Sequence, residues 1–282
     1  MSDRAVNARI APRRTAVLVF ACVTGLAIAG CDRTETRPPA PVEGPAPEPA
    51  APLADPVLDR AAILSAVDGE ASRVAAGLAA PAGDPLAGRR FRMRIAFGCL
   101  GPEPAPPQGV SDAGAPRWSR SGDGRTIRLR FTPDDWTAGD ATGGAVEGFE
   151  QVGGVWINQP WMRSEGCPAP GLPVLDMSAL PAPPTVALAL LRAEGASRLG
   201  RADDRAFNFT VRGQGDDAAP VPARGYRLVL EGRLTPWAGG RVIRCRVNRA
   251  DSRPPCAVGV VLDRLAYEDG ATGATLSEWR PG

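Results

Sequence analysis

The sequence predicts a mainly β fold, an antiparallel sandwich or one or more small barrels, with one amphipathic helix near its N-terminal end. Two observations predict the strands. Apolar residues alternate with polar ones over short segments, and turns rich in Gly and Pro separate those segments. A third observation predicts the helix, because apolar residues recur at three- and four-residue spacing in one stretch. Short strands between frequent turns are typical of sandwiches and barrels.

The helix is expected where a proline-rich segment ends. Asp55 and Pro56 are the residue types preferred at an N-cap and at the first helical position. The helix is expected to end near residue 78, ahead of Pro-Ala-Gly at 81–83. Its apolar stripe comprises Ile63, Val67, Ala71, Val74 and Leu78. We expect this stripe to pack against the helix's own domain.

The first strand is expected over 91–99, where apolar residues alternate with Arg92 and Arg94. A hairpin follows, with strands at 117–121 and 126–132 around Gly-Asp-Gly at 122–124. A strand pair is expected over 149–158, with Gly153-Gly154 as its turn or bulge. Further strands are expected at 186–192, 206–212, 226–234, 241–247, 257–268 and 275–279.

Composition divides the chain into three parts: 1–30, 31–55 and 56–282. Eight prolines lie between Pro38 and Pro56, which favours a disordered, extended tether rich in Pro and Ala. At about 3.1 Å per residue this tether spans roughly 70 Å. The proline-rich stretch 168–184 is either an ordered loop within one domain or a linker between two modules, 56–167 and 185–282.

The N-terminal 30 residues have the pattern of a signal peptide. Four arginines lie within residues 1–14, and an apolar segment of 16 residues follows, shorter than the roughly 20 that a membrane-spanning helix needs. The end of this segment resembles the lipobox of bacterial lipoproteins, in which an aliphatic residue and two small residues precede a cysteine. The corresponding residues here are Ile28, Ala29, Gly30 and Cys31.

The resemblance implies that a peptidase cuts before Cys31, that diacylglycerol is attached to the thiol, and that the new amine is acylated. The partner of the N-terminus is then a membrane, and the domain faces the periplasm of a bacterial cell envelope. Asp32 follows directly. An acid at that position resembles an inner-membrane retention signal in some enteric bacteria, so the choice between inner and outer membrane stays open.

The cysteines of the exported part are expected to form two disulfides. After Cys22 leaves with the signal peptide and Cys31 is lipidated, an even number remains: Cys99, Cys167, Cys245 and Cys256. The last two lie at the ends of adjacent predicted strands, which favours a local bridge and leaves the first two to pair with each other. Zinc is the rival interpretation. The chain has neither a CxxC motif nor a histidine, so we expect no metal site.

The chain contains no histidine and no lysine, so all 33 basic residues are arginines. Histidine-dependent hydrolases and His-ligated metals are therefore excluded in their usual forms, as are Schiff bases and Gly-Lys-Ser/Thr phosphate loops. Carboxylate chemistry remains. Its candidates are Asp134-Asp135, Glu147 with Glu150, and Asp203-Asp204, with Asp263 and Glu231 as strand acids whose faces the pattern does not assign. Acids in such turns more often cap the backbone.

Charge argues against a nucleic-acid partner. Removal of residues 1–30 takes away four of 33 arginines and one of 31 acids, leaving 29 against 30, whereas nucleic-acid binding normally needs a basic excess. The arginines alternate in three predicted strands: Arg90, Arg92, Arg94, then Arg128, Arg130, then Arg244, Arg246. Such rows suit lipid phosphates or acidic glycans, or they form a solvated face balanced by the acids.

Trp156, Asn158 and Trp161 form a candidate binding patch near a predicted strand end, because indole rings and amides bind sugars and peptides. The alternative is that these tryptophans belong to the core or its rim. We expect a membrane-anchored envelope lipoprotein with a non-enzymatic binding or structural role, a protein or glycan partner and no cofactor. The alternative function is a histidine-free, carboxylate-based hydrolase acting on envelope glycans.

Overall fold

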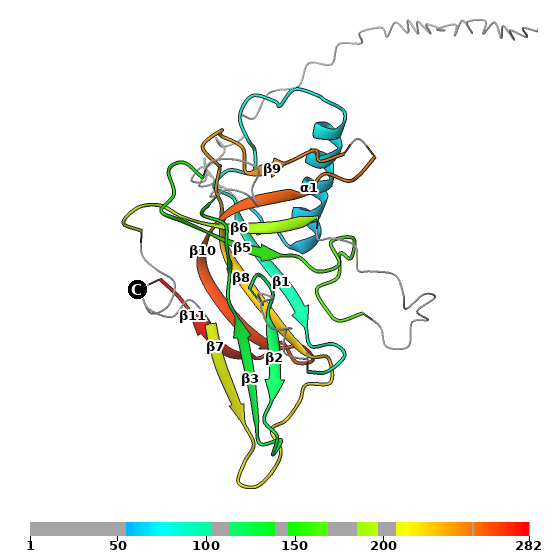
Figure 1. Cartoon of the computed structure of the whole chain (residues 1–282), viewed down its shortest axis with the longest axis vertical. Coiled ribbons are helices and arrows are strands. Elements are labelled where there is room, and N and C mark those ends of the chain that lie inside the picture. The colour runs from blue at the N-terminus through cyan, green and yellow to red at the C-terminus, as the bar shows by residue number, and fades with distance from the viewer. Residues whose placement is uncertain are drawn as a thin grey trace, which may run out of the picture. The chain divides into compact units, whose positions relative to one another are not determined.

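The computed structural model describes residues 55–102, 113–138, 146–168, 185–196, 207–249 and 251–281. The signal segment, Cys31, the tether and Asp203-Asp204 lie outside the described residues. The described residues belong to one compact unit, Leu53–Gly282. They form two β-sheets and one helix (Figure 1), so the prediction of a mainly β fold is confirmed.

Helix α1 spans Arg60–Ala75, with Asp59 as its N-cap: the Asp59 carboxylate accepts a hydrogen bond from the Ala62 N–H at 2.8 Å. The expected N-cap at Asp55 was wrong. Leu58 still forms a bridge with Phe91 in extended conformation, so the helix begins only after it. The helix ends at the C-cap Ala76, short of residue 78. Within the described segments, no helix combines the length and apolar character needed to cross a membrane.

The larger sheet has the order β1-β8-β10-β6-β5-β4, with β9 and β11 also paired to β10. Its strands are β1 (Arg90–Phe97), β4 (Asp134–Asp135), β5 (Gln151–Trp156), β6 (Val186–Arg192), β8 (Tyr226–Leu234), β9 (Ile243–Cys245), β10 (Cys256–Asp269) and β11 (Thr275–Trp279). The sheet is mixed, because β6 and β10 run parallel. The expectation of purely antiparallel sheets was wrong at this pair. Between β6 and β10 the chain passes through β7, β8 and β9, and this long connection lets β10 run in the same direction as β6.

The smaller sheet has the order β2-β3-β7 and is antiparallel. Its strands are β2 (Arg117–Arg120), β3 (Thr126–Phe131) and β7 (Phe207–Arg212), so the predicted hairpin is confirmed. Inward residues of this sheet, such as Trp118 and Leu129, share one core with Tyr226 and Tyr267 of the larger sheet. The Tyr267 hydroxyl donates to the Phe207 carbonyl at 2.8 Å and joins the two sheets.

Strand β10 changes partners along its length. Its first part pairs with β6 and β9, whereas most of its contact with β8 and all of its contact with β11 come later. The register with β8 shifts around Asp263, where Leu262 faces Gly232 and Arg264 faces Glu231. A Cβ at Gly232 would lie 2.0 Å from the Val261 carbonyl oxygen, so glycine permits this close approach.

Two expected strands differ from the structure. The segment 149–158 forms one strand, β5. Its glycines do not form a turn, because they leave space for neighbouring side chains. A Cβ at Gly154 would lie 2.0 Å from Cε2 of Trp136. The strand expected over 241–247 is limited to Ile243–Cys245.

Both predicted disulfides are confirmed. Cys245 and Cys256 are direct cross-strand partners in β9 and β10. Cys99 and Cys167 join the end of β1 to the segment that follows β5, across a sequence separation of 68 residues.

Candidate functional site

A second apolar cluster lies on the face of β5, β6 and β10 opposite the main core. Alternation along the strands creates it: Leu188 and Val258 enter the main core, whereas their neighbours Ala187 and Ala257 face the other way. The small alanine side chains leave room for indole rings. The buried members of this cluster are Trp136, Val152, Ala187, Ala189, Leu191, Trp237 and Ala257.

A shallow cavity opens at the edge of this cluster, and we call it the Trp–Arg pocket. It is lined by Trp136, Trp156, Ala187, Arg244, Arg246, Pro255, Cys256 and Ala257. Its cavity volume is about 10 Å³, room for about one water molecule. Preformed small-molecule sites are usually far larger, so a ligand would lie on this surface rather than inside it.

The aromatic side of the Trp–Arg pocket is held in a defined geometry. Trp136 and Trp156 meet edge to face, with ring centroids 5.1 Å apart. The indole N–H of Trp136 donates to Asp134 Oδ2 at 3.0 Å, and Gly154 provides the space for its ring. Trp156 remains partly exposed. A ligand therefore meets one preorganised aromatic surface.

The basic side of the Trp–Arg pocket comes from β9 and the residue after it. The Arg244 guanidinium carbon lies 4.5 Å from the ring centroid of Trp237, a cation–π contact, and burial lowers the pKa of Arg244. Arg246 is exposed. The described lining contains no Asp or Glu, and Cys256 is in a disulfide. The described groups can therefore stack and donate hydrogen bonds, but they supply neither a nucleophile nor a general base.

The other two residues of the predicted patch lie in a turn held by α1. Arg60, 3% exposed, donates to the carbonyls of Asn158 at 2.9 Å, Gln159 at 3.1 Å and Met162 at 2.9 Å. Trp161 in this turn is 70% exposed. The described ring contacts join Trp156 to Trp136 and do not include Trp161. The binding role of Trp156, Asn158 and Trp161 stays a prediction.

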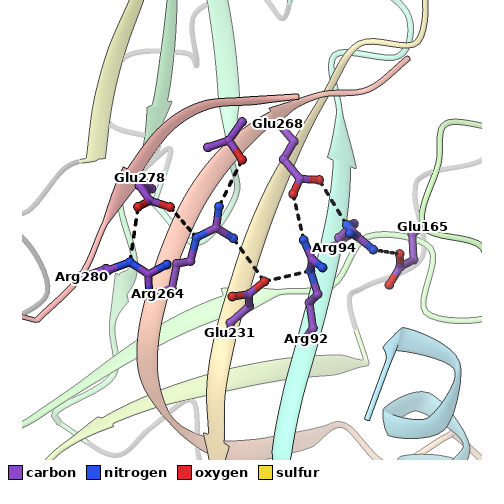
Figure 2. Close-up of polar contacts among 9 residues, drawn as sticks. Arg92, Arg94, Glu165, Glu231, Arg264, Glu268, Glu278 and Arg280 are labelled. Atoms are coloured by element: carbon purple, nitrogen blue, oxygen red, sulfur yellow. Dashed lines mark hydrogen bonds and ion pairs between the residues drawn. The ribbon is translucent and has the colours of Figure 1, made fainter. Parts of the chain in front are cut away.

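Arginines of β1 bind carboxylates on the outer face of the larger sheet (Figure 2). Arg92 contacts Glu231 at 2.9 Å and Glu268 at 3.1 Å. Arg94 contacts Glu268 at 3.2 Å and Glu165 at 2.7 Å. Within the row Arg90, Arg92 and Arg94, the last two are therefore paired with acids of the same domain.

The network continues across β10 to β11 (Figure 2). Arg264 contacts Glu231 at 3.2 Å and Glu278 at 2.7 Å, and Arg280 contacts Glu278 at 3.3 Å. Hydrogen bonds from Arg264 and Arg280 lower the pKa of Glu278. Asp263, 3.7 Å from Arg233, has a side chain 49% exposed. Neither Glu231 nor Asp263 therefore lies on an apolar inward face.

Glu268, which is 3% exposed, is a buried acid that sequence patterns did not identify. It lies in a predicted strand, but the register shift around Asp263 changes which residues of β10 face outward. The signal available in the sequence was the row Arg92 and Arg94, because a buried carboxylate needs cationic partners.

No protein-family model, curated protein or solved structure matches this chain. Its function must therefore be inferred from its own residues and their arrangement.

Most acids named as catalytic candidates have structural partners where they are described. Asp135 accepts from the Thr137 N–H at 3.1 Å, and Glu150 lies 3.4 Å from Arg192. An open groove of about 770 Å³ is lined by Gly148, Phe149, Glu150, Arg192, Glu194, Gly195 and Ala196. Glu147 is exposed. Among the described residues, no group of three or more cysteines and acids is placed to hold a metal ion.

Proposed function

We propose that this chain is a lipoprotein of the bacterial cell envelope whose exported domain binds an envelope ligand without chemical turnover. Cys31 carries the lipid, and the tether 31–55 connects it to a sandwich-like or barrel-like β domain facing the periplasm. The observation that supports binding is the Trp–Arg pocket. It places two indole rings beside two guanidinium groups, which suits a planar sugar or peptide group bearing a carboxylate.

The same pocket favours binding over catalysis. Acid–base hydrolysis of a glycan needs two carboxyl groups across a cleft, and the described lining has none. The most buried glutamate, Glu268, lies between Arg92 and Arg94 on the other part of the sheet. Both of its carboxylate oxygens contact guanidinium groups, so this acid belongs to an ion-pair network and does not line a cleft.

The groove beside β5 and β6 supports the second candidate, a carboxylate-based glycan hydrolase, because it brings Glu150 and Glu194 to one concave surface. A general acid needs burial that raises its pKa. Glu194 is exposed, and the Glu150 side chain is 39% exposed and paired with Arg192. This arrangement makes hydrolysis the weaker proposal.

Replacement of Cys31 by Ser should abolish lipid labelling and release the protein from the membrane fraction. The lipid is attached to the thiol, so a hydroxyl at this position cannot replace it. Metabolic labelling with palmitate and membrane fractionation measure both effects. The matched control is Cys22→Ser, within the proposed signal peptide, which should label normally. Labelling of the Cys31→Ser chain would contradict the anchor.

Trp156→Ala should weaken retention of the Cys31→Ser chain on purified peptidoglycan by on the order of tenfold, because it removes one stacking surface. Cosedimentation with peptidoglycan measures this retention. Trp161→Ala is the matched control, since Trp161 lies outside the Trp–Arg pocket.

Two results would contradict this assignment. Loss of retention in Trp161→Ala alone would move the binding site to the turn after β5. Release of soluble peptidoglycan fragments by the parent chain, abolished in Glu150→Gln or Glu194→Gln, would favour the hydrolase.

A further inference from the structure

The outer face of the smaller sheet carries arginines and no acid from its own strands. The three strands read RWSR, TIRLRF and FNFTVR. Their buried residues, among them Trp118, Ile127 and Phe131, face the core, so alternate residues face outward. We call this surface the Arg face: Arg117, Ser119, Thr126, Arg128, Arg130, Asn208, Thr210 and Arg212.

Strand register arranges these residues in three rungs. Arg130 lies between Arg117 and Asn208, and Arg128 lies between Ser119 and Thr210. Arg212 lies opposite Thr126. Neighbouring strands are about 4.8 Å apart, and alternate residues of one strand about 6.7 Å apart. The arginine positions therefore recur at regular spacing on this face, with residues that carry hydroxyl and amide groups between them.

The outer faces of the two sheets differ in the acids that their own strands supply. On the larger sheet, Arg92, Arg94 and Arg264 each meet a glutamate of the same sheet. On the Arg face, the strands themselves supply no carboxylate, and Arg128 and Arg212 are exposed to solvent. Arginines in the edge strands β2 and β7 can be explained as protection against pairing with other chains. This explanation does not extend to Arg128 and Arg130, because they lie in the central strand β3.

We propose that the Arg face binds an acidic polysaccharide. Guanidinium forks match carboxylate groups, and the hydroxyl and amide side chains between them match the hydroxyl groups of sugar rings. The residues of the face offer no apolar side chain to insert into a bilayer. The proline-rich composition of residues 31–55 also predicts a spacer of roughly 70 Å between the domain and the membrane. A glycan therefore fits better than a lipid surface. The inference rests on the proposed function, because export places the domain among envelope glycans.

The test uses the full chain with Cys31→Ser, and its probe is polygalacturonate, with neutral dextran as the uncharged comparison. Affinity electrophoresis measures the dissociation constant. Arg128→Gln combined with Arg212→Gln should weaken binding to polygalacturonate about two- to thirtyfold, the loss of two exposed ion pairs. Both side chains are exposed, so the melting temperature should stay unchanged.

The matched control combines Arg233→Gln with Arg280→Gln. These side chains are 63% and 60% exposed, lie outside the Arg face and carry the same total charge. The control should bind polygalacturonate like the parent chain. Equal losses in both double variants would mean a net-charge effect and would overturn the inference.

Further outcomes also decide whether the Arg face binds an acidic polysaccharide. Absence of binding to polygalacturonate by the parent, or equal binding to dextran, overturns the inference. Binding to phosphatidylglycerol vesicles but not to polygalacturonate assigns the Arg face to a membrane and also overturns it. Peptidoglycan retention that depends on Trp156 but not on Arg128 and Arg212, without polygalacturonate binding, leaves the proposed function intact while this inference fails.

Discussion

Glu268→Ala should lower the free energy of unfolding by about 3 kcal/mol, the scale seen when one partner of a buried ion pair is removed. The Glu268 side chain is 3% exposed, and its two oxygens contact Arg92 and Arg94. Without it, two guanidinium groups lose a shared counter-charge. Both arginines keep partial exposure and a second glutamate each, which holds the loss near the lower end of that scale.

Urea denaturation of Glu268→Ala and Glu278→Ala makes the comparison. Glu278 belongs to the same network and undergoes the same chemical change, but its side chain is 43% exposed. Its removal should cost clearly less than the removal of Glu268, because water screens exposed pairs. Glu268→Gln should fall between, since it keeps the side-chain volume and loses the charge. Equal losses for Glu268→Ala and Glu278→Ala would show that burial of Glu268 has no energetic consequence.

Removal of the Cys99–Cys167 disulfide should destabilise the domain more than removal of Cys245–Cys256. The two bridges span 68 and 11 residues, and loop-closure entropy grows with length. In the chain-entropy model the long bridge contributes about 4 kcal/mol and the short one about 3 kcal/mol. Cys99→Ala is therefore expected to lower the free energy of unfolding more than Cys245→Ala does.

Thermal and urea unfolding of Cys99→Ala with Cys167→Ala, against Cys245→Ala with Cys256→Ala, measures this difference without leaving a free thiol. Mass mapping under non-reducing conditions should first recover both bridges in the parent. A larger loss from the short bridge would contradict the entropy argument. It would indicate that local support of β9 on β10 outweighs the long loop.

Local patterns predicted those elements whose faces differ most in polarity. In β1 and β3, buried apolar residues alternate without interruption with less buried residues, most of them arginines, so the strands follow from the sequence. In β5 the pattern breaks at Gly153 and Gly154, which resemble a turn. Only the position of Trp136, brought against Gly154 by pairing of β4 with β5, shows why glycine is needed.

The candidate binding residues show the same difference between what a local pattern predicts and what distant contacts decide. Trp156 was identified as a binding residue from its sequence neighbours, but its ring contact comes from Trp136, and the guanidinium groups beside it come from the distant β9 region. Asn158 and Trp161 are close in sequence, yet Arg60 holds their turn against α1. Spacing along a chain does not specify which distant residues share a surface.

By itself, the sequence determined the chemistry open to this protein. Without histidine or lysine, many catalytic and metal sites are excluded in their usual forms. The alternation of apolar and polar residues in strands such as β1 and β3 is likewise a local property of the sequence. Only the tertiary structure decided the parallel pairing of β6 with β10, the burial of Glu268 and the alignment of arginines from β2, β3 and β7 on the Arg face. The physical reason is that register and burial depend on contacts between residues far apart in sequence, which a local pattern does not contain.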